Sequence, residues 1–355
     1  MKKIKVSAPG KLHLLGEHVV VYGKPAIITA VDRRCFVEVT PRRDKKIKII
    51  SENLKAEKTV TEQEITDKTV DAQKAWESWI ITNNIALLKS ITSDPLNYAI
   101  IVIGETLKDF KKKINLGFNL KIKSDIPIGS GMGSSAAVAV SVAGAVSLLF
   151  NKSLDKEIIN EIAYLSEQKK HGLPSGGDNS ASCFGGLVWY RKETPDLKII
   201  ETIPFAFPQK LAKNFIVIDT GIPMESTGEM VSNVRTLYQK NPEFVENILS
   251  SQEELVRELL SAIKTGDDTL MIRIIRAGEK NLEALGVVSS SVKILIRGIE
   301  KIGGAAKICG GGGVKKGAGM LLAYHKNFNS LRPLLLHLRL QYYKITLGEQ
   351  GLRQE

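Results

Sequence analysis

A glycine- and serine-rich segment, residues 127–137, carries the clearest chemical signal in the chain. It reads Pro-Ile-Gly-Ser-Gly-Met-Gly-Ser-Ser-Ala-Ala, follows a β-like run at 120–126 and opens an apolar run of small residues at 136–149. Glycine lets a backbone approach a phosphate closely, and the free N–H groups of a first helical turn attract anions. The segment therefore predicts a site for a polyphosphate such as ATP; a glycine-rich turn without a ligand is the alternative.

This segment is neither of the two common glycine motifs. It lacks the Lys-Ser/Thr pair of a P-loop and the glycine offset of a dinucleotide fingerprint. The residues that we expect around the phosphates are Pro127, Gly129, Ser130, Gly131, Met132, Gly133, Ser134 and Ser135.

Two carboxylates further along are candidates for catalysis and metal binding. Asp178 lies in a glycine-rich turn, residues 174–179, where an exposed carboxylate could accept the proton of a hydroxyl group. Glu167 and the hydroxyl of Ser135 are candidate Mg²⁺ ligands, since Mg²⁺ usually takes one or two carboxylates plus phosphate oxygens. The structural alternatives are a turn or helix cap for Asp178 and Ser135, and a surface glutamate for Glu167.

The N-terminal segment adds a lysine and a histidine. Lys11 follows Pro-Gly, and a short apolar run then leads to Gly-Glu-His at residues 16–18. A lysine beside a general base could hold the negative charge that develops in phosphoryl transfer, whereas the alternative is a surface lysine. His18 could donate to a substrate oxygen. The other histidines form no metal-ligand spacing.

A third glycine-rich segment, residues 309–319, contains four consecutive glycines and leads into an apolar run. A flexible hairpin is one interpretation. Each glycine costs backbone entropy on folding, so four in a row are unusual in a simple connector. We therefore predict a loop that packs against the ligand site of another lobe.

Strands and helices mix around these segments without a regular βαβ repeat, which predicts an α+β fold. Apolar and alternating runs predict the strands, and three- and four-residue spacing predicts the helices. The expected strands are 4–6, 26–31, 35–39, 46–50, 120–126, 214–219 and 318–324; the expected helices are 72–88, 136–149, 154–167, 242–265, 267–285 and 291–302. Polar sequence with prolines at 191–208 predicts a lobe boundary, with domains at 1–195 and 196–355.

Composition argues against several classes of protein. The 355 residues can form a large core in two lobes, and there is neither a signal-peptide pattern nor an apolar run of about 18 residues that would cross a membrane. Three well-separated cysteines predict free thiols in a reducing cytoplasm. The net charge of +12 comes from scattered lysines and arginines without interleaved aromatic residues, so we expect no nucleic-acid partner.

Three motifs, in this order, resemble the GHMP kinase superfamily. They are Ala-Pro-Gly-Lys with Gly-Glu-His at residues 8–18, the segment at 127–137, and the segment at 307–319, and together they span nearly the whole chain. Residues 16–27 and 174–179 are most similar to the mevalonate kinase branch. The third motif departs from the animal pattern Gly-Ala-Gly-Gly-Gly-Gly-Cys, since here Val-Lys-Lys-Gly follows the four glycines.

The resemblance implies a fold and a set of roles. The fold is two-lobed, with an ATP-binding N-terminal lobe similar to ribosomal protein S5 and a ferredoxin-like C-terminal lobe. Asp178 matches the catalytic aspartate, and Lys11 matches the lysine that orients the substrate hydroxyl. Ser135 and Glu167 match the magnesium ligands, and residues 129–134 match the loop around the ATP phosphates. The matching substrate contacts are Glu17, His18 and Thr227, with Ser226 as the alternative to Thr227.

The implied activity is ATP- and Mg²⁺-dependent phosphorylation of the primary hydroxyl of (R)-mevalonate to 5-phosphomevalonate, a step of isoprenoid synthesis. The alternatives within the same scaffold are a phosphomevalonate kinase, a mevalonate 3-kinase, a sugar kinase and a diphosphomevalonate decarboxylase. A non-catalytic ligand sensor is the alternative outside enzymes. The oligomeric state stays open, with a homodimer as one option.

Overall fold

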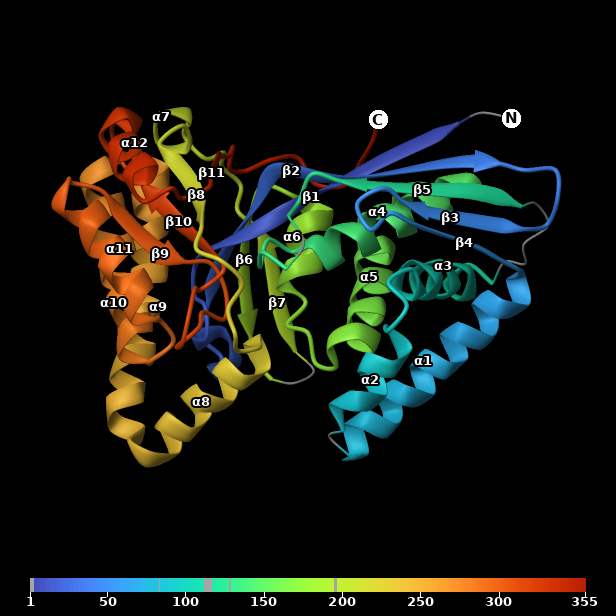
Figure 1. Cartoon of the computed structure of the whole chain (residues 1–355), viewed down its shortest axis with the longest axis horizontal. Coiled ribbons are helices and arrows are strands. Elements are labelled where there is room, and N and C mark those ends of the chain that lie inside the picture. Colours follow the sequence, from blue (N-terminus) through green and yellow to red (C-terminus); the bar gives the residue numbers. More distant parts are fainter. Residues whose placement is uncertain (1–2, 83, 112–116, 128, 195–196) are drawn as a thin grey trace.

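Two β-sheets organise the chain, one in each half of the molecule (Figure 1). The structure is a computed structural model, and it describes residues 3–82, 84–111, 117–127, 129–194 and 197–355. The strands are β1 (Ile4–Leu15), β2 (Ala26–Pro41), β3 (Ile47–Ser51), β4 (Ala56–Val60), β5 (Phe118–Ser124), β6 (Leu187–Lys192), β7 (Lys198–Thr202), β8 (Phe215–Asp219), β9 (Ala305–Ile308), β10 (Met320–Tyr324), β11 (Tyr342–Lys344) and β12 (Arg353–Gln354).

Helices pack against both sheets. They are α1 (Glu62–Thr82), α2 (Ile85–Ile91), α3 (Asn97–Asp109), α4 (Ser134–Leu149), α5 (Lys156–His171), α6 (Gly177–Phe184), α7 (Gln209–Ala212), α8 (Thr227–Lys240), α9 (Pro242–Thr265), α10 (Asp268–Ala284), α11 (Ser290–Lys301) and α12 (Phe328–His337), with a 3₁₀ turn, η1 (Val19–Tyr22). The predicted α+β, two-lobed fold is confirmed. Among the described residues, no helix combines the length and the apolar character needed to cross a bilayer.

The larger sheet carries the first motif on its longest strands. Within the described residues it has eight strands, in the order β12-β1-β2-β5-β3-β4, with β6 beside β2 and β7 beside β6. The strand expected at 4–6 continues to Leu15, so Pro9 and Lys11 both lie within β1, where the pairing with β2 shifts register between Pro9 and Gly10. Buried apolar residues on either side of Lys11 explain the continuous strand, since Val6 and Ala8 before it and Leu12, Leu14 and Leu15 after it all belong to the apolar core.

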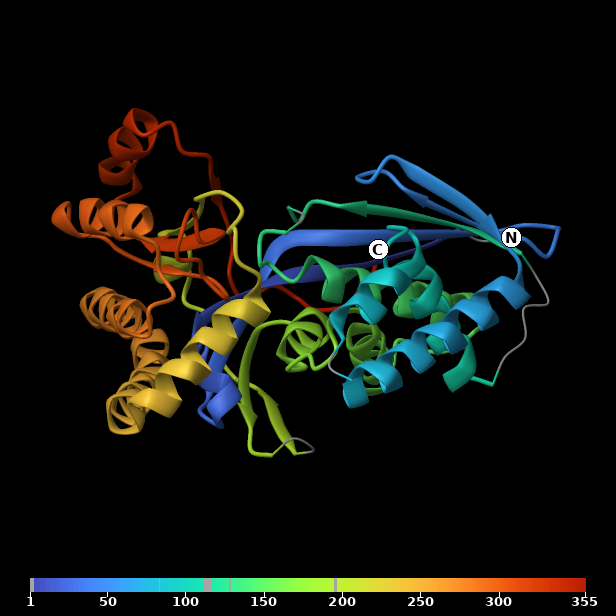
Figure 2. The same cartoon turned by 60° about the horizontal axis from the view of Figure 1, so that its bottom comes forward.

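Helices α3, α4 and α5 lie on one face of this sheet, and α1 lies outside them (Figure 2). α4 is buried along most of its length because its small side chains let it pack closely against β1 and β2. The single helix predicted at 72–88 is instead two helices, α1 and α2. α1 begins earlier because Thr61 and Glu64 bond each other's backbone N–H groups, and Asn84 caps α2.

The smaller sheet, β11-β8-β10-β9, forms the second lobe with α8 to α12. α9, α10 and α11 agree with the predicted helices to within two residues. The predicted domain division at 195 and 196 falls on residues outside the described ranges. On its C-terminal side, β7 pairs with β6, and β12 pairs with β1, so the chain returns to the larger sheet at its end. The division stays a prediction.

Candidate active site

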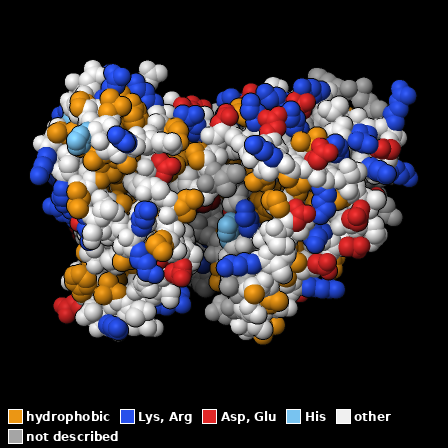
Figure 3. Space-filling view, in the orientation of Figure 1, with side chains coloured by type: hydrophobic (Ala, Val, Ile, Leu, Met, Phe, Trp, Pro, Cys, Tyr) orange, Lys and Arg blue, Asp and Glu red, His pale blue; other side chains and the backbone are white. Residues whose placement is uncertain are grey.

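A cleft of about 960 Å³ lies between the two lobes, and Figure 3 shows a hollow between the two halves of the molecule. All three glycine-containing motifs contribute to its lining, although they lie far apart in the sequence. Of the predicted site residues, those that line it are Lys11, Glu17, His18, Gly129, Ser130, Gly131, Gly133, Ser134, Ser135, Glu167, Asp178 and Thr227. The predicted residues Pro127 and Met132 are not part of the lining.

Asp178 and Lys11 form an ion pair in this cleft. Lys11 Nζ lies 2.9 Å from Asp178 Oδ1; the lysine side chain is 6% exposed, whereas 36% of the aspartate side chain is open. Burial by itself raises the pKa of the Asp178 carboxyl, but the charge of Lys11 and the contact with His13 outweigh it and hold the pKa well below its usual range. The carboxylate is therefore ionised at neutral pH and exposed where a ligand can reach it.

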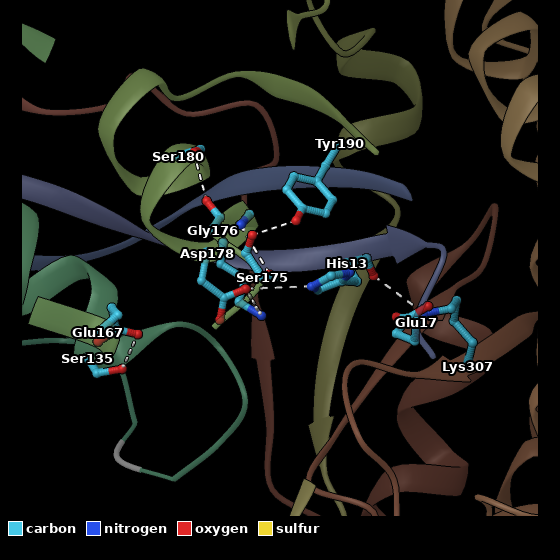
Figure 4. Close-up of polar contacts among 12 residues, drawn as sticks. His13, Glu17, Ser135, Glu167, Ser175, Gly176, Asp178, Ser180, Tyr190 and Lys307 are labelled. Carbon is cyan, nitrogen blue, oxygen red and sulfur yellow. Dashed lines mark hydrogen bonds and ion pairs between the residues drawn. The ribbon is translucent and has the colours of Figure 1, made fainter. Parts of the chain in front are cut away.

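Local contacts fix the position of Asp178 in the first turn of α6. Tyr190 donates its hydroxyl to the carbonyl of Ser175, and the hydroxyl of Ser180 donates to the carbonyl of Gly176. Gly176 has φ +92° and caps the helix, so Asp178 itself is not the cap. In Figure 4, Asp178 lies between His13 on one side and the pair Ser135 and Glu167 on the other.

The phosphate-loop candidate packs directly on the lysine of the first motif. Gly129, Gly131 and Gly133 all have positive φ, and Gly133 precedes the first residue of α4. The backbone N–H of Lys11 donates to the carbonyl of Met132 at 2.9 Å. A Cβ on Gly133 would lie 2.7 Å from Lys11 Cγ, so only glycine leaves room for the lysine side chain. Met132 supports the loop from the protein side: its side chain is buried in the core, and its carbonyl accepts the N–H of Lys11.

The structure brings together Ser135, in the first turn of α4, and Glu167, near the end of α5. Ser135 Oγ donates to Glu167 Oε2 at 3.1 Å, and the hydroxyl of Tyr98 donates to Glu167 Oε1. The Glu167 side chain is only 5% exposed. A serine hydroxyl and a carboxylate are hard oxygen donors, the kind that Mg²⁺ prefers together with phosphate oxygens, so the pair fits this ion.

The second lobe closes the cleft near the predicted substrate contacts. His18 Nε2 lies 2.9 Å from the carbonyl oxygen of Gly311, and burial lowers the pKa of His18. Through this bond the third glycine segment packs against a cleft residue of the other lobe, while a ligand at this place stays a prediction. Thr227 lines the cleft, whereas the hydroxyl of Ser226 caps α8 by accepting from the N–H of Glu229, which favours Thr227 over Ser226.

Glu17 has an additional partner that sequence reasoning missed. Its carboxylate pairs with the ammonium of Lys307, and both side chains are buried. Lys307 comes from β9, so this ion pair joins the two lobes beneath the cleft. The lysines at 315 and 316 in the same segment are exposed and lie outside the lining. Glu17 as a substrate contact stays a prediction.

Other lining residues were also absent from the sequence-based set. They include His13, Ser51, Asn53, Thr92, Pro95, Tyr98, Lys170 and His171. Residues 51–54 and 92–99 form a wall of the cleft without any glycine-rich or charged motif that could have signalled it. His13 has no metal-ligand spacing to the other histidines, so the sequence pattern assigns it no role.

Comparison with known proteins gives consistent results. Residues 97–186 match the family model described as the GHMP kinases N terminal domain. The chain is 34% identical to a mevalonate kinase of Pyrococcus furiosus over 88% of its length and 87% of the relative's. It is 32% identical to the mevalonate kinase of Thermococcus sibiricus, with the same coverage.

Solved structures extend this similarity to the fold. The Methanococcus jannaschii mevalonate kinase superposes with a TM-score of 0.78 at 21% identity, covering 98% of this chain and 99% of that one. A Lactococcus lactis galactokinase complexed with galactose superposes with a TM-score of 0.72 at 20% identity, covering 99% and 95%. Since proteins with different substrates share the fold, the fold alone does not identify the substrate.

Proposed function

The chain belongs to the mevalonate kinase family of GHMP kinases, and from this premise we propose that it transfers the γ-phosphoryl group of ATP to the primary hydroxyl of (R)-mevalonate. The observation that carries the proposal is the Lys11–Asp178 ion pair, which lies in the cleft directly beside the glycine loop that opens α4. A base and a phosphate cradle joined in this way suit phosphoryl transfer to a hydroxyl group.

Asp178 acts as the base in the proposed mechanism. It accepts the hydroxyl proton while the hydroxyl oxygen forms a bond to the γ-phosphorus. The bond from that phosphorus to the β–γ bridging oxygen breaks, and ADP leaves with the electron pair. Lys11 keeps Asp178 ionised and places a positive charge beside the transferring group, where negative charge develops.

The glycine loop and α4 hold the phosphates. The three glycines with positive φ expose backbone N–H groups, and the helix start adds a partial positive charge. We propose that Ser135 and Glu167 hold Mg²⁺, with Tyr98 orienting the carboxylate through its hydroxyl. When bound, the ion neutralises phosphate charge and orients the β- and γ-phosphates.

The substrate side of the cleft is consistent with a small anionic alcohol. His18 and Thr227 line the cleft from opposite lobes, so a small substrate between them would contact both lobes. We assign the reaction to the cytoplasm on the support of three cysteines, all unpaired and buried. A homodimer is a further prediction, and sedimentation of the purified protein tests it.

The function is tested with a substrate panel. Purified protein is assayed for ADP release with ATP, Mg²⁺ and, separately, mevalonate, phosphomevalonate, homoserine and galactose. We expect turnover with mevalonate, and phosphorus NMR should place the new phosphate on the primary hydroxyl. Preferred turnover of another alcohol, or release of carbon dioxide, would reassign the substrate. ATP binding without turnover on any of them would favour a ligand sensor.

The catalytic assignment is tested by Asp178→Ala with Asp178→Asn as the isosteric companion. Both should lose turnover by roughly a thousandfold or more while still binding ATP, since the cradle does not include this carboxylate. Isothermal titration calorimetry measures the binding, and the coupled assay measures the rate. Near-normal kcat in either variant would exclude Asp178 as the base.

A further inference from the structure

His13 lies beside Asp178, and nothing in the sequence motifs gives it a role. It comes from β1, two residues after Lys11 and on the same side of the strand, because alternate residues of a strand share a face. Its Nε2 lies 3.6 Å from Asp178 Oδ1, and Figure 4 shows the ring facing that carboxylate. The residue is 9% exposed and lines the cleft.

The two neighbours of Asp178 on β1 approach the same carboxylate oxygen. Lys11 Nζ is 2.9 Å from Oδ1, and His13 Nε2 is 3.6 Å from Oδ1. With one such contact the carboxylate of Asp178 could still rotate about the line that joins Oδ1 to its partner. Two contacts from different backbone positions restrict that rotation. The arrangement leaves Oδ2 as the oxygen available to a substrate hydroxyl.

We propose that His13 is a positioning residue, which donates its Nε2–H to Asp178 Oδ1 and so directs Oδ2 at the hydroxyl to be phosphorylated. The inference rests on the proposed function, because it assigns a partner to the proposed base. At 3.6 Å the contact is longer than a hydrogen bond in the present structure. Contacts of catalytic groups are often long before substrate binds and shorten in the reacting complex.

The surroundings of His13 favour this role over a purely structural one. Its Nδ1 is buried without a hydrogen-bond partner among the described residues. The polar contact of the ring is therefore the one from Nε2 to Asp178. A histidine kept only for packing would more often satisfy a buried nitrogen through a backbone group. His18 interacts electrostatically with His13, and Lys307 donates to the backbone carbonyl of His13 rather than to its ring. The carboxylate of Asp178 is the acceptor that faces Nε2.

Three substitutions separate the donor role from ring packing. Gln places an amide N–H close to the position of Nε2, whereas the amide of Asn is too short to reach Oδ1, and Leu keeps an apolar volume without a donor. We expect His13→Leu and His13→Asn to lower the single-turnover rate roughly 10- to 100-fold, the scale of a small misplacement of a reacting group. His13→Gln should restore much of that rate.

The measurement is rapid-quench single turnover with enzyme in excess over ATP, because product release can limit steady-state kcat. KM for ATP and for the alcohol, and the melting temperature, should stay close to those of the unsubstituted protein in all three variants. An unchanged rate in His13→Leu, or equal losses in the Gln and Leu variants, would overturn the positioning role. If the unsubstituted protein itself fails to phosphorylate mevalonate, the proposed function fails instead, so the two failures are distinguishable.

Discussion

Replacing Glu279 by Gln should make the stability of the protein less sensitive to pH. Glu279 is fully buried on α10, and its Oε2 accepts the backbone N–H of Ile308 at 3.0 Å. The nearby ammonium of Lys307 is already paired with Glu17, so two carboxylates share one cation. Burial raises the pKa of Glu279 from 4.5 to about 8, because the ionised form would lie in an apolar interior with too little compensating charge.

The sign and size of the effect follow from this shift. Below pH 4.5 the glutamate is protonated in both the folded and the unfolded states, so its contribution to the free energy of unfolding does not change with pH. Between 4.5 and 8 the unfolded chain releases the proton while the folded chain keeps it, and the free energy of unfolding falls by roughly 1.4 kcal/mol per pH unit. Above pH 8 both states are ionised, and the accumulated loss, at most about 5 kcal/mol, stays constant.

The assay compares thermal unfolding of the unsubstituted protein and Glu279→Gln from about pH 5 to pH 9. Other titrating groups are common to both proteins and cancel in the difference. The variant should gain stability relative to the parent as the pH rises, and the difference should level off above pH 8. Glu254→Gln, which changes an exposed glutamate of α9, is the matched control. A difference that stays flat from pH 5 to 8 would refute the burial argument.

Two further variants test the packing around the site and the larger lobe. Gly133→Ala should lower kcat at least about tenfold, because φ +70° disfavours a side chain and the new Cβ would displace Lys11. The coupled assay measures kcat, and an unchanged value would contradict the prediction. Lys169→Met should cost roughly 3–5 kcal/mol in urea unfolding, because Glu105 would lose its buried partner at 3.1 Å. Adding Glu105→Gln should recover part of that loss, and no recovery would argue against the ion pair as the cause.

The sequence was most informative where local chemistry decides the structure. The glycines before α4 and the small residues within it predicted a helix start that exposes backbone N–H groups, and the structure has that arrangement. The long helices α9 and α10 were predicted well because each has a clear apolar stripe on one face. In these places the pattern of a short window contains the necessary information.

The missed features depend on what surrounds a segment. α3 is buried along nearly its whole length, and a mainly apolar run of this kind cannot be assigned to a helix or a strand from its pattern alone. Lys307 lies in an apolar strand and finds Glu17 across 290 positions of sequence, a pairing that no local pattern encodes. Only the family resemblance predicted that Lys11 lies beside Asp178. No local pattern links His13 to Asp178 either, because Asp178 lies on α6, far along the sequence.

The return of β12 to the edge of β1 has a consequence for synthesis of the protein. Val6 pairs with Gln354 and Ser7 with Arg353, and Arg34 donates to the carbonyls of Gln350 and Gly351. The ribosome makes this closing strand only after the entire smaller lobe. Until then one margin of the larger sheet presents unpaired backbone groups, the kind of edge that other chains can join. The nascent protein therefore keeps this part of β1 without its partner strand until after the smaller lobe has been made.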